Sequence, residues 1–501
     1  MDETDTERTA DRMETGITGL DAVLRGGLLP RSVYLVKGQP GAGKTILASH
    51  ICFHQASRGE RALYVTLLSE THDRMLAHLA QLDFFDPTLI PSRLSYVSGQ
   101  ATIEQSGLKG LSELLRREVR SHHPTLIVLD GFVTVEETAA TPHELKKFIH
   151  ELQIACSLVG ATMLLLTSAR ADPASPAHAM VDGVIQLSDH RVDKRSEREL
   201  ELTKFRGSGY LKGGHAFQIT DAGFIVHPRL ESVLRDPPTN DPCKRERLST
   251  GLPRLDDVFQ GGLLCGSSTV LFGTTGTGKT TLGLHFLNGS SASEPGLHFG
   301  FFEAPARVLF KSELLGLDLA QKQKAGHLEI QWHPSTERVL DALGHRLLTS
   351  VRARGVKRLF VDGFDGFLKA AADEERITHF MAALTNELRG LGVTALYTSE
   401  LHDLFGNRVS LPAQGMSSLA ENALLLRLVE RDRQLARMLT VIKLRDSDYD
   451  GTQRELRIAP RATDVADAMP SSPERLDARV GGVGVVRRTV RRLVGRRRPR
   501  S

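Results

Sequence analysis

Two stretches of the chain decide its fold, and each has the pattern Gly-x-x-x-x-Gly-Lys-Thr. The first is Gly38-Gln39-Pro40-Gly41-Ala42-Gly43-Lys44-Thr45, and the second is Gly273-Thr274-Thr275-Gly276-Thr277-Gly278-Lys279-Thr280, followed by Thr281. Each follows a short apolar run and opens a helical pattern, the context in which this motif forms a phosphate-binding loop (P-loop). Backbone N–H groups and a helix N-terminus favour a phosphate anion there. We therefore expect both octapeptides, with Thr281, to bind ATP.

The two P-loops mark a tandem duplication. The segment Thr15–Asp21, followed by Gly26-Gly27-Leu28, recurs as Thr250–Asp256, followed by Gly261-Gly262-Leu263, at the same offset of 235 residues that separates the loops. Self-similarity at a fixed offset indicates repeated domains. We predict an acidic tail, a first domain, a linker, a second domain and a basic tail, over residues 1–13, 14–232, 233–247, 248–463 and 464–501.

Each half alternates strand-like and helical runs, which predicts an α/β fold with a mostly parallel sheet flanked by helices. Short strands after the last helix predict an antiparallel extension of each sheet. The expected parallel strands are 33–37, 62–67, 125–129 and 161–167 in the first half, and 268–272, 296–302, 358–361 and 394–398 in the second. The expected helices of the first half are 44–57, 73–81, 106–120 and 142–159, and its extension strands are 184–187, 200–205 and 216–219.

The P-loop residues have acidic counterparts later in each half. Lys44 and Lys279 are expected to contact the β- and γ-phosphates of ATP. Asp130 and Asp362 end apolar runs, where a carboxylate can hold Mg²⁺ together with the hydroxyls of Thr45 and Thr280. We therefore predict Mg²⁺ as the second cofactor.

Hydrolysis also needs a carboxylate that orients or deprotonates the attacking group. Glu70 and Glu303 are the candidates, because each follows the second predicted strand of its half. The alternative is that each only stabilises the N-terminus of the following helix.

Composition indicates a folded protein whose positive charge is confined to one end. Eight arginines and no acid lie in residues 487–501, so residues 1–486 carry a net charge of −4 although the whole chain carries +4. The basic tail can bind an acidic partner, nucleic acid or membrane surface, or be a solvated end, which we favour. Four widely spaced cysteines, with no transmembrane segment or signal peptide expected, predict a cytoplasmic protein.

These motifs resemble the KaiC-like branch of the RecA superfamily, whose members are double-domain ATPases. The likeness rests on the entry segments, the paired P-loops and a Lys-x-Arg near the end of each domain. The resemblance implies two tandem RecA-like domains and a homohexameric ring with ATP at the subunit interfaces. It also implies that Lys204 and Arg206, and likewise Lys443 and Arg445, contact ATP bound by the adjacent subunit.

The resemblance further implies serine autophosphorylation in the second domain, with Ser417 and Ser418 at the phosphoacceptor positions. One departure concerns the two adjacent glutamates usual in the family. The second domain has Glu303-Ala304 and the first has Ser69-Glu70, so Glu303 matches the first glutamate of the pair and Glu70 the second.

Three function classes follow. The leading hypothesis is an ATP-hydrolysing ring that phosphorylates itself and acts as a signalling or timing switch. The second is an ATP-dependent switch without kinase activity. The third is a DNA-acting RecA-type ATPase, which the acidic domains and the single tryptophan disfavour.

Overall fold

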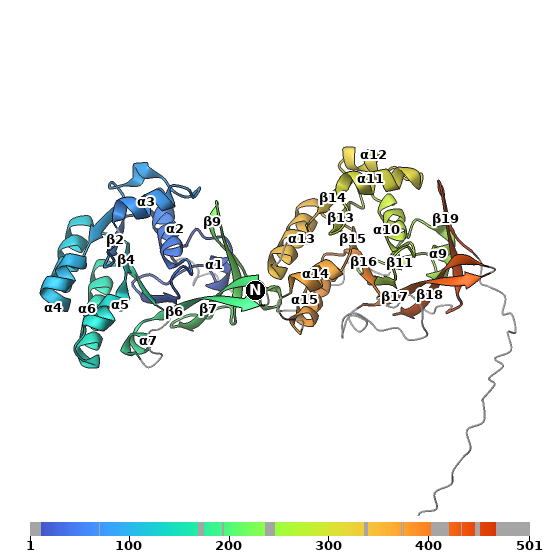
Figure 1. The fold of residues 1–501 in the computed structure, drawn as a ribbon. Coiled ribbons are helices and arrows are strands. Elements are labelled where there is room, and N and C mark those ends of the chain that lie inside the picture. The colour runs from blue at the N-terminus through green and yellow to red at the C-terminus, as the bar shows by residue number, and fades with distance from the viewer. Residues whose placement is uncertain are drawn as a thin grey trace, which may run out of the picture.

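The computed structural model describes residues 12–69, 71–168, 175–192, 195–235, 246–334, 339–371, 373, 375–401, 420–431, 433–445 and 451–466. Within them, each half of the chain builds one nine-stranded sheet, and the two halves lie side by side (Figure 1). The strand orders are β3-β2-β4-β5-β1-β6-β7-β8-β9 and β14-β13-β15-β16-β12-β17-β18-β19-β20. The duplication in the sequence is therefore a duplication of topology.

The strands of the first sheet are β1 Val33–Gly38, β2 Ala62–Thr66, β3 Leu94–Ser98, β4 Leu126–Asp130, β5 Thr162–Ser168, β6 Gly183–Val192, β7 Arg195–Phe205, β8 His215–Thr220 and β9 Gly223–His227. Those of the second are β12 Ser268–Gly273, β13 Gly296–Gly300, β14 Leu328–Trp332, β15 Arg358–Asp362, β16 Thr394–Glu400, β17 Asn422–Arg431, β18 Gln434–Leu444, β19 Arg454–Ala459 and β20 Ala462–Val465. A short pair, β10 Arg247–Leu248 and β11 Leu263–Leu264, stands apart from them.

The helices of the first half are α1 Leu20–Val23, α2 Lys44–Ser57, α3 His72–Leu79, α4 Gln100–His122, α5 Phe132–Thr138, α6 Pro142–Val159, α7 Pro176–Met180 and α8 Leu230–Val233, with a 3-10 turn at Pro87–Leu89. Those of the second half are α9 Pro253–Val258, α10 Lys279–Asn288, α11 Pro305–Leu314, α12 Leu319–Lys324, α13 Leu340–Arg354, α14 Asp365–Ala370 and α15 Arg376–Gly390. No helix of the described chain is long and apolar enough to cross a membrane.

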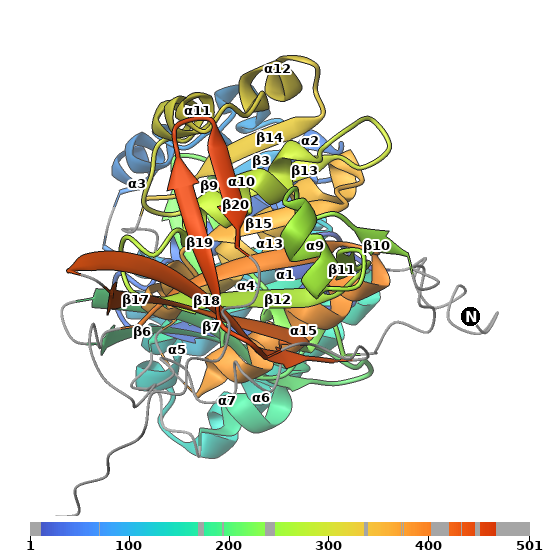
Figure 2. The same ribbon diagram turned by 90° about the vertical axis from the view of Figure 1, so that its right-hand side faces the viewer.

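The predicted fold class is confirmed. In the first sheet the strands in the order β3-β2-β4-β5-β1-β6 pair in parallel with one another, and β7, β8 and β9 add the antiparallel extension. The second sheet repeats this arrangement, and Figure 2 shows β17, β18 and the β19–β20 hairpin at its extended end.

Some elements differ from the sequence prediction. The edge strands β3 and β14 were not predicted, and β6, assigned to the antiparallel extension, pairs in parallel with β1. Helix α4 begins at Gln100 rather than Ser106, across a non-helical Gly107 with φ of 60°. A glycine with that φ interrupts the helical pattern on which the prediction depended.

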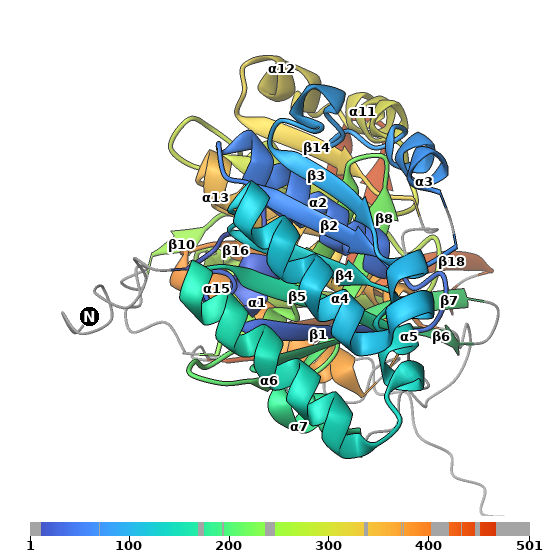
Figure 3. The same cartoon turned by 90° about the vertical axis from the view of Figure 1, so that its left-hand side faces the viewer.

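Helices cover both faces of each sheet, so the central strands are buried on both sides. Alternate residues of β1 show this, because Leu35 packs in one core with α4 and α6, while Val36 packs in another with α2. Figure 3 shows α4 and α6 across the near face of the first sheet. This layering fixes the carboxyl ends of the parallel strands, where both P-loops begin.

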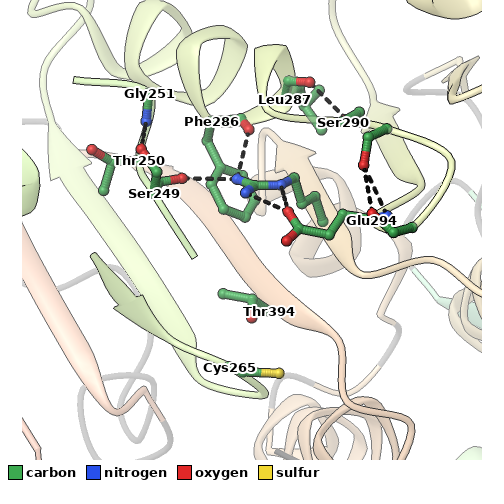
Figure 4. Close-up of polar contacts among 12 residues, drawn as sticks. Ser249, Thr250, Gly251, Cys265, Phe286, Leu287, Ser290, Glu294 and Thr394 are labelled. Atoms are coloured by element: carbon green, nitrogen blue, oxygen red, sulfur yellow. Dashed lines mark hydrogen bonds and ion pairs between the residues drawn. The ribbon is translucent and has the colours of Figure 1, made fainter. Parts of the chain in front are cut away.

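The two halves differ at one buried position of their sheets. The first half has Leu126 there, and the second half has an arginine, Arg358. Ala62 of β2 pairs with Leu126, and Gly296 of β13 pairs with Arg358, whose exposed fraction is 4%. The Arg358 guanidinium donates to Glu294 Oε2, to the Ser249 carbonyl at 2.8 Å and to the Phe286 carbonyl at 3.2 Å. Figure 4 shows Ser249, Phe286 and Glu294 converging there. These bonds tie the entry segment of the second half to its P-loop helix.

An ion network joins the two halves. Leu230 of α8, at the end of the first half, is buried in the core of α13 and α15, and its N–H donates to Asp341 Oδ1 at 3.0 Å. Arg376 donates to both oxygens of Glu231, at 2.7 and 3.0 Å, and to Asp341 Oδ1 at 2.6 Å. The first half is therefore anchored to the second by packing and by paired charges.

Candidate nucleotide sites

Both P-loops have the strand–loop–helix geometry that a phosphate site requires. Gly43 ends the first loop with φ of 96°, and a Cβ atom there would lie 2.6 Å from Ile219 Cδ1. Gly278 has φ of 99°, and its Cβ atom would lie 2.7 Å from Ile458 Cδ1. Glycine is required at both positions, because the backbone is left-handed and a hydrophobic residue of the sheet extension packs directly against it.

The two P-loop lysines make equivalent contacts. Lys44 Nζ donates to the carbonyls of Gly38 at 2.8 Å and Gln39 at 3.1 Å. Lys279 Nζ donates to the carbonyls of Gly273 at 2.6 Å and Thr274 at 2.9 Å. Burial lowers the pKa of both lysines, opposed by nearby carboxylates. Each ammonium group is therefore held inside its loop, where an anion can meet it.

The structure brings together each predicted pair of Mg²⁺ ligands. Thr45 Oγ1 donates to Asp130 Oδ2 at 3.0 Å, and Thr280 Oγ1 lies 3.1 Å from Asp362 Oδ2. Among the described residues, no group of three or more His, Cys, Asp or Glu side chains could hold a metal ion. The pairs nevertheless fit Mg²⁺, which is usually bound through one or two protein oxygens, several waters and the phosphates of the nucleotide.

In each half a second hydroxyl donates a hydrogen bond to the aspartate, but it comes from the strand on one side in the first half and on the other side in the second half. In the first, the Tyr64 hydroxyl of β2 donates to Asp130 Oδ2 at 2.8 Å. His298 takes the Tyr64 position in the second half, and Thr398 of β16 donates to Asp362 Oδ1 at 2.9 Å. Strand register makes Leu166 the counterpart of Thr398. Burial raises the pKa of Asp130, and the hydrogen bonds from Tyr64 and Thr45 oppose this.

Counted from the ends of the preceding strands, the candidate catalytic glutamates are not at matching positions. Asp130 pairs with Thr66, and Asp362 pairs with Gly300. Glu303 is the third residue after Gly300, whereas the third residue after Thr66 is Ser69. Glu70 is one residue further along and lies outside the described residues. Because α3 begins six residues after Thr66 and α11 begins five residues after Gly300, the strand-to-helix connection of the first half is one residue longer.

Sequence reasoning missed two carboxylates beside the second P-loop. Glu400 ends β16 opposite Gly273, and the Thr275 hydroxyl donates to Glu400 Oε1. The Glu400 N–H donates to Asp365 Oδ2 at 3.3 Å. The predicted strand stopped at Thr398, two residues short. Had the strand been extended to the polar residue at its end, Glu400 would have been found, because carboxyl ends of neighbouring parallel strands share an edge.

The predicted trans contacts lie away from the P-loop of their own domain. Lys204 pairs with Val184, which pairs with Leu35, three residues before the strand end at Gly38. Lys204 Nζ donates to the carbonyls of His178 and Ala179, and Arg206 Nη2 also donates to Ala179. Burial and the neighbouring Arg206 lower the pKa of Lys204.

The second half repeats this placement. Lys443 pairs with Ala423, which pairs with Val270, again three residues before the strand end. Its Nζ donates to the Ala420 carbonyl at 2.7 Å, and the backbone N–H of Arg445 donates to the Glu421 carbonyl. Ser417 and Ser418 lie outside the described residues, and Ala420, which directly precedes Glu421 and β17, is the nearest described position.

The comparisons with known proteins agree with this geometry. The family described as the ATPase KaiC matches residues 13–231 and again 248–468. The chain belongs to the KaiC ATPase family. It is 24% identical over 487 residues to the circadian clock oscillator protein KaiC of Parasynechococcus marenigrum, covering 94% of this chain and 93% of the relative.

Two further relatives give the same result. The circadian clock oscillator protein KaiC of Synechococcus elongatus is 24% identical over 473 residues, 91% of this chain and 89% of that protein. The circadian clock protein KaiC3 of Synechocystis is 25% identical over 468 residues, 89% of this chain and 90% of the relative. The likeness to KaiC ATPases therefore runs through both halves.

Proposed function

We propose that this KaiC-family ATPase is a homohexameric ring that binds and hydrolyses Mg²⁺-ATP and phosphorylates itself on Ser417 or Ser418, acting as a signalling or timing switch. The observation that carries this proposal is the Lys443–Ala420 hydrogen bond. It brings a predicted trans ATP contact beside the segment that follows the phosphoacceptor serines.

The amino end of β17, which this segment precedes, lies away from the P-loop of the same domain. Glu421 follows Ala420 and its successor Asn422 pairs with Thr269, whereas the P-loop leaves β12 at Gly273, four residues further. At about 3.3 Å per residue the separation along the sheet is about 13 Å. Phosphoryl transfer needs reacting atoms about 3–3.5 Å apart. The arrangement therefore favours transfer from ATP on one subunit to serine on its neighbour.

In the proposed reaction each residue of the second domain has a definite task. Lys279 binds the β- and γ-phosphates, and Thr280 and Asp362 would hold Mg²⁺, which would supply positive charge to the phosphates. The serine Oγ forms a bond to the γ-phosphorus, the bond from that phosphorus to the β–γ bridging oxygen breaks, and ADP leaves. Glu303 accepts the serine proton. In hydrolysis, water replaces the serine hydroxyl.

Radiolabelled ATP and purified protein test this proposal. We expect label in the chain, mapped to Ser417 or Ser418, together with release of inorganic phosphate. Phosphate release without label would leave the ATPase switch without kinase activity. Stimulation of hydrolysis by single-stranded DNA would favour the DNA-acting class, against which the net charge of −4 over residues 1–486 argues.

The same proposal places the protein in the cytoplasm, with its own subunits as the predicted partner. Nucleic acid is not an expected partner of the two domains, although the basic tail at 464–501 can bind it through its arginines. The predicted domain limits, 14–232 and 248–463, are part of this proposal.

A further inference from the structure

Glu303 is paired with a lysine that sequence reasoning did not single out. Lys311 lies on α11, eight residues after Glu303, and its Nζ donates to Glu303 Oε1. The exposed fractions of the two side chains are 35% for Lys311 and 28% for Glu303. The pair is therefore partly shielded from water, so its charges are screened less than those of an exposed pair.

The rest of α11 fixes where Lys311 points. The helix begins at Pro305, just after Glu303, and its buried residues are Val308 and Ser312. Lys311 is three residues after buried Val308, a spacing that puts the two side chains on one side of the helix, so the packing of Val308 also orients the lysine stem. The lysine can therefore hold the carboxylate that precedes the helix without movement of the backbone.

The two oxygens of Glu303 have different surroundings. Oε1 is bound by Lys311, whereas Oε2 is buried and has no hydrogen-bond partner among the described residues. Both ring nitrogens of buried His298 are also without partners in the described chain. Glu303 and Asp362 are close enough to His298 to raise its pKa, although burial lowers it by more. One carboxylate oxygen is thus fixed by a cation and the other remains available as an acceptor.

We propose that Lys311 is a positioning residue that fixes Glu303 through Oε1 and leaves Oε2 to accept the proton of the attacking hydroxyl. This inference rests on the proposed role of Glu303. Lys311 itself contacts neither nucleotide nor serine in this scheme. Its effect comes from holding the carboxylate in one orientation, and a small misplacement of a catalytic group can cost about 10²-fold in rate.

The first half has no lysine at the position equivalent to Lys311. The buried residues Met75 and Leu79 of α3 match Val308 and Ser312 of α11 in position, so His78 takes the place of Lys311. His78 is exposed, and a histidine side chain is shorter than that of lysine. The positioning contact is therefore proposed for the second nucleotide site alone.

The test measures ATP hydrolysis by the second site in the full-length protein. The rate of Lys279→Ala, which retains only the first site, is subtracted from each total rate. We expect Lys311→Met to lower kcat of the second site roughly 10-fold to 100-fold with little change in KM, and Lys311→Arg to restore most of it. Exposed Lys324→Met at the end of α12 is the matched control and should have the wild-type rate.

A double-mutant cycle separates positioning from a merely structural role. If Lys311 acts through Glu303, Lys311→Met should cause no further loss in a Glu303→Gln background. If Glu303→Gln slows the second site and Lys311→Met does not, or if their losses multiply, the positioning role is wrong and the role of Glu303 stands. If Glu303→Gln has no effect, the role of Glu303 is wrong and the inference falls with it. Lys311→Gln repeats the test should the methionine variant fail to fold.

Discussion

The Tyr64 hydroxyl donates a 2.8 Å hydrogen bond to Asp130 Oδ2, although the equivalent residue of the second half is His298. There Thr398 supplies the donor to Asp362, and its counterpart in the first half is Leu166. The hydroxyl that donates to the aspartate therefore comes from β2 in the first half and from β16 in the second. Each aspartate keeps one hydroxyl donor besides the P-loop threonine, which indicates that this support matters more than the residue that gives it.

Tyr64→Phe should therefore lower Mg²⁺-ATP affinity at the first site and leave the second site unchanged. Tyr64 is fully buried, so the substitution removes only a hydroxyl and leaves little new space. We expect a loss of about 1.5–3 kcal/mol in the free energy of unfolding, the usual contribution of a hydrogen bond to a charged group. Chemical denaturation measures it. Thr398→Val is the matching change in the second half, and reduced Mg²⁺-ATP affinity at the opposite site in either variant would contradict the assignment.

Substitution of each P-loop lysine should abolish ATP binding at its own site and leave the other site unchanged. Lys44→Ala should abolish ATP binding in the first half and Lys279→Ala in the second, because each removes the cation that neutralises phosphate charge. Counting bound ATP per chain should give one for each single variant and none for the double variant. Exposed Lys146→Ala on α6 is the control. Two ATP bound to the double variant would show that neither P-loop binds as proposed.

Removal of Arg376 should destabilise the junction between the two halves. Arg376→Met leaves buried Asp341 without its cation and Glu231 with Arg229 alone, and breaking a buried pair costs about 3–5 kcal/mol. The exposed pair Arg352–Glu387 offers a matched control, since Arg352→Met should cost about 0–1 kcal/mol. Equal losses in the free energy of unfolding for the two variants would contradict the anchoring role.

The stabilisation from the Glu231–Arg376 pair should also decrease at acid pH. Burial raises the pKa of Glu231, but hydrogen bonds and charge from Arg376 outweigh it and lower the pKa to about 2 from the usual 4.5. The stabilisation is therefore complete above pH 4.5 and is lost as pH falls toward 2. In Arg376→Met this part of the acid dependence should become smaller, and the remainder comes from Arg229, which also donates to Glu231.

The sequence predicts the duplicated P-loops, their strands and the paired aspartates, because these depend on local patterns. It does not predict the edge strands β3 and β14, whose residues Ser95 and Gln331 interrupt the apolar pattern. Nor does it predict Lys311 or Glu400. Lys311 reaches its partner only through the fold of α11, and Glu400 gains its meaning from the pairing of β16 with β12.

Ring assembly should depend on nucleotide. If Lys204 and Lys443 contact ATP bound by a neighbour, nucleotide stabilises the assembled state, since a ligand favours whichever state binds it. Light scattering should show a hexamer with ATP and Mg²⁺ and smaller species after both are removed. Lys204→Met combined with Lys443→Met should weaken assembly without loss of folding. A monomer with ATP, or a hexamer indifferent to it, would rule out the trans contacts.

Phosphoryl transfer between subunits can be tested in mixed rings. Lys279→Ala subunits keep both serines but lack the second ATP site, whereas Ser417→Ala/Ser418→Ala subunits keep the site and lack the acceptors. Neither should incorporate phosphate alone. After mixing, label should appear on the Lys279→Ala subunits, because Ala420 precedes the amino end of β17, away from the P-loop of its own domain, and we propose that this segment meets the site of a neighbour.

A third subunit type controls for the chemistry. Adding Glu303→Gln to the serine-free subunits should slow labelling by roughly 10²- to 10⁴-fold, the usual contribution of a general base, while ATP binding persists. Lys324→Met in the same subunits should leave the labelling rate unchanged. If the rings exchange subunits and the Lys279→Ala chains stay unlabelled while wild-type rings are labelled, transfer occurs within one subunit. The proposed transfer between neighbouring subunits would then be wrong, although Asn422 lies about 13 Å along the sheet from the P-loop of its own domain.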